Sequence, residues 1–114
     1  DYTSSCAAPF VDGFVKNGAT AIACASDLIA HGVLAELYKL GLNVPRDISV
    51  VGFDDIPLAR YTTPPLTTIR QNRLTIGKSV CMAMEQIMDG NAISRLLLMP
   101  ELVIRESTGP VKPA

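Results

Sequence analysis

The 114-residue sequence has little net charge and no long apolar run, and these two absences exclude several classes of protein. Ten basic residues are spread along the chain against eleven acidic ones, whereas sequence-independent binding to nucleic acid needs clustered Lys and Arg. No apolar stretch approaches the roughly 18–20 residues that span a bilayer. With 48% hydrophobic residues the chain is apolar enough to fold as one domain. We therefore expect a globular chain that by itself binds neither DNA nor a membrane.

Cysteine and histidine are also scarce. The three cysteines lack CxxC spacing and His31 is the only histidine, so the sequence predicts no zinc site. Buried free thiols suit a reducing cytoplasm, which is where we expect the protein. The chain contains no glycine-rich phosphate loop and no turn that resembles a nucleophile elbow. We therefore predict neither a cofactor nor an enzyme activity.

Strand-like apolar runs alternate with apolar residues at helical spacing. Short uncharged runs at residues 20–25 and 48–53 are typical of strands that are buried on both faces of a parallel sheet. A helix is predicted between them, because Ser26 is a good N-cap, apolar residues recur every three or four positions, and Gly41 closes the pattern. A strand, a helix and a second strand make a βαβ unit with parallel strands, so the sequence predicts an α/β fold.

Five further elements are predicted outside this unit, from apolar spacing and from Pro, Asn or Gly residues near the element ends. They are a helix over residues 9–17, an extended segment over residues 66–70, a helix over residues 72–90, and strands over residues 96–99 and 101–105 on either side of Pro100.

Polar side chains follow both strands of the predicted unit. Ser26 and Asp27 follow the first strand, and Asp54 and Asp55 follow the second. Open α/β proteins bind ligands where the carboxyl ends of parallel strands meet, so we expect a polar ligand site there. Capping of the helix explains Ser26 and Asp27 equally well, and Asp54 can also serve to order the loop that follows. Neighbouring residues at a strand end point to opposite faces, so the two carboxylates are not expected to act as an acid–base pair.

Four motifs occur in a fixed order and together span residues 20 to 108. They are Ala25-Ser26-Asp27-Leu28-Ile29-Ala30-His31-Gly32, the segment from Gly41 through Val44-Pro45 to Gly52-Phe53-Asp54-Asp55, Pro64-Pro65-Leu66-Thr67-Thr68-Ile69-Arg70-Gln71, and Leu102-Val103-Ile104-Arg105-Glu106-Ser107. Each motif alone is weak, but the ordered set is specific. It resembles the C-terminal part of the effector-binding domain of LacI/GalR bacterial transcription regulators.

The resemblance implies a periplasmic binding protein-like class I fold, a three-layer α/β sandwich with a parallel sheet in each of two subdomains. It assigns residues 1–69 and about 101–109 to the C-terminal subdomain, and residues 70–100 to the crossover and to one helix of the N-terminal subdomain. The sequence shows no signal peptide, and because it begins without Met we expect a fragment. The resemblance implies that this fragment begins partway through the C-terminal subdomain and lacks the DNA-binding helix-turn-helix.

The implied function is to sense a small-molecule effector, a sugar or another polar metabolite, within a dimeric regulator whose DNA binding is controlled by allostery. Operator DNA would be bound only through the missing N-terminal domain. A periplasmic sugar-binding receptor of a transporter is the alternative, since it shares the fold. An upstream helix-turn-helix would exclude that alternative.

The resemblance also assigns roles to individual residues. Asp54 matches the family aspartate that accepts hydrogen bonds from effector hydroxyls or ring nitrogens, and Ser26 stands where many sugar-sensing members carry Asn. Gln71 and Arg73 match crossover positions that face the ligand cleft. Arg73 replaces an aromatic residue found in some members, which favours an anionic or strongly polar effector. With Asp27 from the strand-end argument, these residues form the predicted ligand site.

Dimerisation in the family uses the helix after the first motif and the loop after the second. At those positions this chain has His31, Leu34, Ala35, Tyr38, Tyr61 and Thr62. Ordinary core packing is the alternative for Leu34 and Tyr38, because both lie at helical spacing with apolar neighbours.

Overall fold

The computed structural model describes residues 3–93 and 95–113. These residues fall into two compact units. Unit 1 comprises Asp1–Arg70 and Leu102–Ala114, and unit 2 comprises Gln71–Glu101. Within these ranges, every helix is too short or too polar to span a bilayer.

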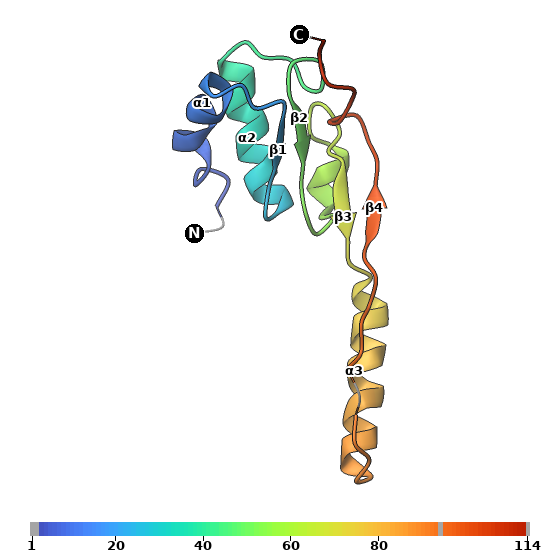
Figure 1. Ribbon diagram of the computed structural model, residues 1–114. Coiled ribbons are helices and arrows are strands. Elements are labelled where there is room, and N and C mark those ends of the chain that lie inside the picture. Colours follow the sequence, from blue (N-terminus) through green and yellow to red (C-terminus); the bar gives the residue numbers. More distant parts are fainter. Residues whose placement is uncertain (1–2, 94, 114) are drawn as a thin grey trace. The chain divides into compact units, whose positions relative to one another are not determined.

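The centre of unit 1 is a βαβ arrangement, as the sequence predicts. Strand β1 (Ala21–Ala23) pairs in parallel with β2 (Ser49–Val51), and Ile22 lies opposite Val50. Helix α2 (Asp27–Lys39) connects them (Figure 1). The side chain of Ser26 accepts a hydrogen bond from the backbone N–H of Ile29 at 3.2 Å, which confirms Ser26 as the N-cap.

Helix α1 (Ala8–Lys16) packs against α2, and Figure 1 shows both helices on the same side of the β1–β2 pair. Pro9 lies in the first turn of α1, where its missing N–H costs no hydrogen bond. The core forms where the two helices meet the strands. Its fully buried large apolar side chains are Val11, Val33, Leu37, Val50 and Leu66.

Burial of the strands differs from the prediction. In β1 only Ile22 is buried, and the flanking Ala21 and Ala23 are exposed. In β2 only Val50 is fully buried. The prediction of strands buried on both faces is therefore wrong for the described chain, because α1 and α2 both cover one face of the sheet.

A second strand pair extends the sheet next to β2. Strand β3 (Thr68–Arg70) pairs with β4 (Glu101–Val103), and a parallel bridge between Val51 and Thr67 joins β3 to β2. A short 3-10 helix, η1 (Pro57–Arg60), lies in the connection from β2 to β3, which was predicted only as a loop.

The segment after β4 is bonded tightly into the sheet through Ser107, which is fully buried. Its hydroxyl donates to the carbonyl of Val50 at 2.6 Å and accepts from the N–H of Thr67 at 2.8 Å. The N–H of Val50 in turn donates to the carbonyl of Ser107 at 2.8 Å. This one residue therefore links β2 to the start of β3.

Unit 2 contains helix α3 (Arg73–Met88) and the segment that returns from it. Asn72 caps the helix by accepting a hydrogen bond from the N–H of Thr75 at 3.0 Å, as predicted. No strand forms at residues 96–99, so that prediction is wrong. The apolar residues of α3 do not become buried: Leu74, Val80, Met84, Ile87 and Met88 are all exposed.

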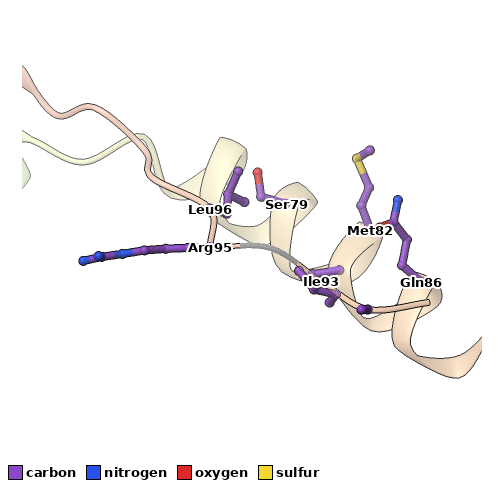
Figure 2. Close-up of a pocket in the computed structure, with 8 residues that line it drawn as sticks. Ser79, Met82, Gln86, Ile93, Arg95 and Leu96 are labelled. Atoms are coloured by element: carbon purple, nitrogen blue, oxygen red, sulfur yellow. The ribbon is translucent and has the colours of Figure 1, made fainter. Parts of the chain in front are cut away.

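A groove of about 280 Å³ lies between α3 and the returning segment (Figure 2). Its lining is mainly apolar and includes Met82, Ile93 and Leu96. Gln86 and Arg95 supply the longer polar side chains. Among the described residues that line it, none carries a carboxylate, a thiol or an imidazole.

Candidate ligand-binding site

The polar segments that follow β1 and β2 meet at one edge of the sheet, as the strand-end argument predicts. The N–H of Asp27, the first residue of α2, donates to the carbonyl of Phe53 at 2.8 Å. The N–H of Asp54 donates to the carbonyl of Ile69, in β3, at 2.8 Å. The start of α2, the turn after β2, and β3 are therefore held together by backbone hydrogen bonds.

Two consecutive residues of this turn have a left-handed backbone. The φ angle is 103° at Asp54 and 50° at Asp55. Non-glycine residues rarely adopt positive φ, and Asp is among the types that tolerate it. The side chain of Asp54 is exposed, and its carboxylate makes no hydrogen bond to any residue in the ranges 3–93 and 95–113. It is therefore available to accept hydrogen bonds from a ligand.

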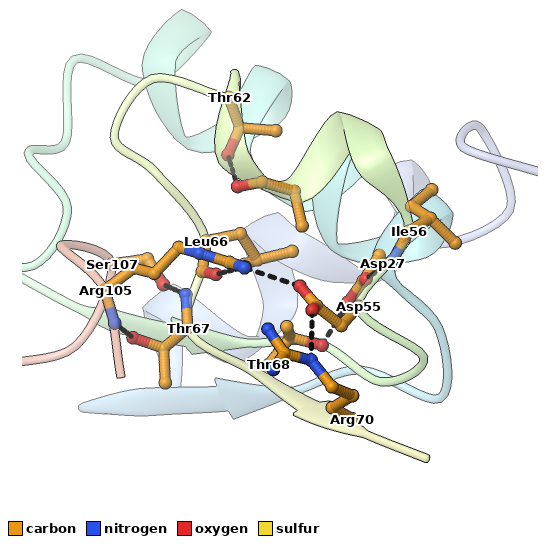
Figure 3. Close-up of polar contacts among 11 residues, drawn as sticks. Asp27, Asp55, Ile56, Thr62, Leu66, Thr67, Thr68, Arg70, Arg105 and Ser107 are labelled. Carbon is orange, nitrogen blue, oxygen red and sulfur yellow. Dashed lines mark hydrogen bonds and ion pairs between the residues drawn. The ribbon is translucent and has the colours of Figure 1, made fainter. Parts of the chain in front are cut away.

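Asp55 lies in a different environment (Figure 3). Its side chain is only 3% exposed, and its two oxygens accept from different guanidinium groups. The Nε of Arg70 donates to Oδ2 at 2.7 Å, and a terminal nitrogen of Arg105 donates to Oδ1 at 2.6 Å. Burial alone would raise the pKa of this carboxyl, but the hydrogen bonds and charges of Arg105 and Arg70 hold the pKa below its usual value. Asp54 and Asp55 therefore do not form an acid–base pair, as expected.

Asp27 lies at the predicted edge of the sheet but is not available to contact a ligand. It is 2% exposed, and both its side-chain oxygens accept hydrogen bonds from other residues of the chain. Oδ2 accepts from the N–H of Ile56 at 2.8 Å, and Oδ1 accepts from the hydroxyl of Thr68. Burial raises the pKa of Asp27 despite these two bonds, and the negative charges of Asp55 and Asp54 add to the increase. Asp27 therefore positions the turn and is removed from the set of ligand contacts.

The other predicted site residues lie on two elements. Ser26 is half-buried, and its oxygen is used by the helix cap. Gln71 and Arg73 are exposed residues of unit 2, next to the N-terminus of α3. Their roles at a ligand stay predictions that rest on the family resemblance.

Sequence reasoning missed the residues that hold the turn. Thr68 lies in the third sequence motif and Arg105 in the fourth, yet nothing local in the sequence indicates which carboxylate each one binds. Thr68 lies 41 residues from Asp27 in sequence, and Arg105 lies 50 residues from Asp55. Within the described ranges, no group of three or more His, Cys, Asp or Glu side chains is arranged to hold a metal ion.

The residues predicted for a dimer surface divide into two groups. His31, Ala35, Tyr38 and Tyr61 are exposed, with 83% of Tyr38 and 80% of Tyr61 accessible. Leu34 and Thr62 are instead buried within the chain.

Burial removes Leu34 and Thr62 from the predicted surface. Leu34 belongs to the hydrophobic core, which confirms the alternative that the sequence analysis gave for this residue. The hydroxyl of Thr62 donates within its own loop, to the carbonyls of Ala59 and Pro64. Tyr38 is exposed, so it is not part of the hydrophobic core.

Comparison with known proteins agrees with the family that the motifs indicate. Residues 3–108 match the family described as periplasmic binding protein-like domain. The regulator MalR of Streptomyces coelicolor is 45% identical over 91 residues, which cover 78% of this chain and 26% of MalR. The chain belongs to the periplasmic binding protein-like domains of the LacI/GalR family. MalR and the 44% identical PurR of Vibrio vulnificus are both named as helix-turn-helix-type transcriptional regulators, not as transport receptors.

Solved structures of LacI/GalR regulators share the fold. The Lac repressor dimer bound to operator and an anti-inducer superposes with a TM-score of 0.86 at 32% identity, over 95% of this chain and 39% of the repressor chain. A LacI-family regulator from Arthrobacter sp. FB24 in complex with lactose has a TM-score of 0.82 at 31% identity, over 94% of this chain and 42% of that one. This LacI/GalR domain thus spans about a quarter of the length of the first curated relatives.

Proposed function

We propose that this chain is the effector-sensing and dimerisation part of a LacI-type transcriptional regulator. The observation that carries the proposal is the turn after β2, where Asp54 is exposed while Asp27 and Asp55 are bonded inside the chain. A carboxylate on a firmly held turn can accept hydrogen bonds from hydroxyl or N–H groups of a small molecule. The relatives are regulators, which supports a sensor and not an enzyme.

In this proposal, unit 1 belongs to the C-terminal subdomain, and unit 2 supplies the crossover and a helix of the N-terminal subdomain. An effector that binds one arrangement of the subdomains better than another shifts the population toward it, and thereby changes the affinity for operator DNA. DNA would be contacted by a domain that is not part of this chain, so the regulator would work in the cytoplasm. The effector would be a sugar or another small polar metabolite.

The first test is a ligand panel on the full-length protein with Asp54→Ala. Thermal shift with D-ribose, lactose and hypoxanthine samples a pentose, a disaccharide and a purine base. The probe is whichever of these compounds binds the unsubstituted protein. We expect Asp54→Ala to bind this probe at least about tenfold more weakly, because a hydrogen bond to a charged group contributes about 1.5–3 kcal/mol.

The matched control for Asp54→Ala is Asp12→Ala, which removes an exposed carboxylate of α1 whose partner is Lys16. Affinity for the probe should be unchanged in the control. An equal loss in both variants, or none in Asp54→Ala, would contradict the role of Asp54.

A second test concerns the proposed homodimer. In the full-length protein, Tyr38→Glu should raise the dimer dissociation constant at least about tenfold in sedimentation equilibrium, because truncating a central aromatic contact costs about 2 kcal/mol or more. Phe10→Glu is the control, since Phe10 is another exposed aromatic residue, 62% accessible, but on α1. Equal weakening by both substitutions would argue against an interface on α2.

A further inference from the structure

We infer that Asp55 is a clamp that joins the effector-binding turn to both strands that connect unit 1 with unit 2. The inference rests on the proposed function of Asp54 and concerns how binding at that residue would be transmitted. Asp55 is therefore a positioning residue, with no ligand contact of its own.

The chain path supports this role. It leaves unit 1 after Arg70, the last residue of β3, and re-enters at Leu102 in β4. Arg105 lies three residues beyond the re-entry. Each of these arginines takes one oxygen of Asp55, so a single carboxylate is bound to the outgoing and to the returning segment at once.

The two halves of the clamp differ in how firmly they are held. Arg105 is 13% exposed, and it also donates through its other terminal nitrogen to the carbonyl of Leu66 at 2.9 Å. Its backbone N–H donates to the hydroxyl of Thr67 at 3.0 Å. Arg70 is 37% exposed. Because Arg70 is the more exposed of the two arginines, solvent can replace its bond to Asp55 more readily than it can replace the bond from Arg105.

The clamp adjoins the proposed effector contact directly. Asp54 precedes Asp55 in the turn, and its N–H is bonded to the carbonyl of Ile69, the residue before Arg70. A ligand that orders the carboxylate of Asp54 restrains the same peptide segment that carries Asp55. Because Asp55 is bonded to Arg70 and to Arg105, the same restraint also acts on the end of β3 and on the segment that follows β4.

The experiment is amide hydrogen exchange on the full-length protein, first without ligand. Asp55→Asn should increase exchange at least about tenfold both in residues 68–71 and in residues 102–105, since one carboxylate is proposed to hold both segments. Asp47→Asn is the control, because it removes another salt-bridged aspartate of unit 1, the partner of Lys112 at 3.1 Å. An increase in only one segment, or an equal increase in the control, would overturn the clamp.

The second arm uses Arg70→Gln and whichever of D-ribose, lactose or hypoxanthine binds the unsubstituted protein. The probe should bind Arg70→Gln within about threefold of its normal affinity and still protect residues 53–55, while its protection of residues 68–71 is lost. A purely structural role of Arg70 would leave that transmitted protection intact, which would overturn the inference. If no probe binds the unsubstituted protein, the proposed function fails for these three probes, and the ligand-free arm alone decides about the clamp.

Discussion

Replacing Asp27 with Ala should lower the free energy of unfolding by about 2–4 kcal/mol, because it removes the acceptor of two hydrogen bonds inside the protein. The N–H of Ile56 and the hydroxyl of Thr68 would lose their partner at a position that is 2% exposed. These bonds join the start of α2 to the loop after β2 and to β3. The loss should appear as a lower urea midpoint with an unchanged slope in the full-length protein.

The control for this prediction is Asp27→Asn. Burial raises the pKa of Asp27, which shows that the charged form is disfavoured at this position. Asn keeps an oxygen for the N–H of Ile56 and can donate to the oxygen of Thr68, so it should cost at most about 1 kcal/mol. Adding Thr68→Val to Asp27→Ala should recover part of the loss, because it removes one of the two unpaired donors. Equal destabilisation by Ala and Asn would show that the charge, and not the hydrogen bonds, matters.

Gly52→Ala is the other substitution with a large expected effect, and we expect it to cost about 1–3 kcal/mol through overpacking. A Cβ at Gly52 would clash with Oδ1 of Asp27 and would lie 2.9 Å from a methyl carbon of Leu66. Neither neighbour can move freely, because Asp27 is bonded to Thr68 and Leu66 is fully buried. The same displacement would disturb the turn that carries Asp54, so affinity for an effector should fall together with stability.

Gly13→Ala is the matched control for the added methyl group. Gly13 lies within α1, and a Cβ there would have no neighbour within 4 Å. Replacing a glycine inside a helix should raise stability by about 0.5–1 kcal/mol. Opposite signs in thermal denaturation are therefore expected for the two substitutions. A stable Gly52→Ala variant would mean that the buried Asp27 network can rearrange at little cost.

Much of the candidate site followed from local sequence. Strand β2 ends at Val51, and two acidic residues follow after Gly52-Phe53, which is enough to place polar side chains at the edge of an α/β sheet. Local sequence did not predict which of these carboxylates would be buried and bonded and which would be exposed. Asp27, Asp54 and Asp55 are the same residue type at similar strand-end positions. They are distinguished by donors from distant segments, which are Ile56 and Thr68 for Asp27, and Arg70 and Arg105 for Asp55.

The extent of burial was the other property that local patterns misjudged. The uncharged run around β1 and the apolar spacing of α3 indicate faces that suit contact with other elements. Whether a face is covered depends on which elements are beside it. In unit 1, α1 and α2 cover one face of the sheet, which leaves Ala21 and Ala23 exposed. No residue of α3 is buried within the described chain.

The sequence by itself determined the three α-helices, the N-caps of α2 and α3, and the parallel βαβ unit, because capping bonds and hydrophobic spacing act over a few residues. Ser26 and Asn72 each bond an N–H only three residues away. Only the tertiary structure decided that Asp54 faces solvent while Asp27 and Asp55 are enclosed. The partners of Asp27 and Asp55 come from segments 15 to 50 residues away. Such bonds form only after the chain has folded, since burial and charge depend on which segments meet in space.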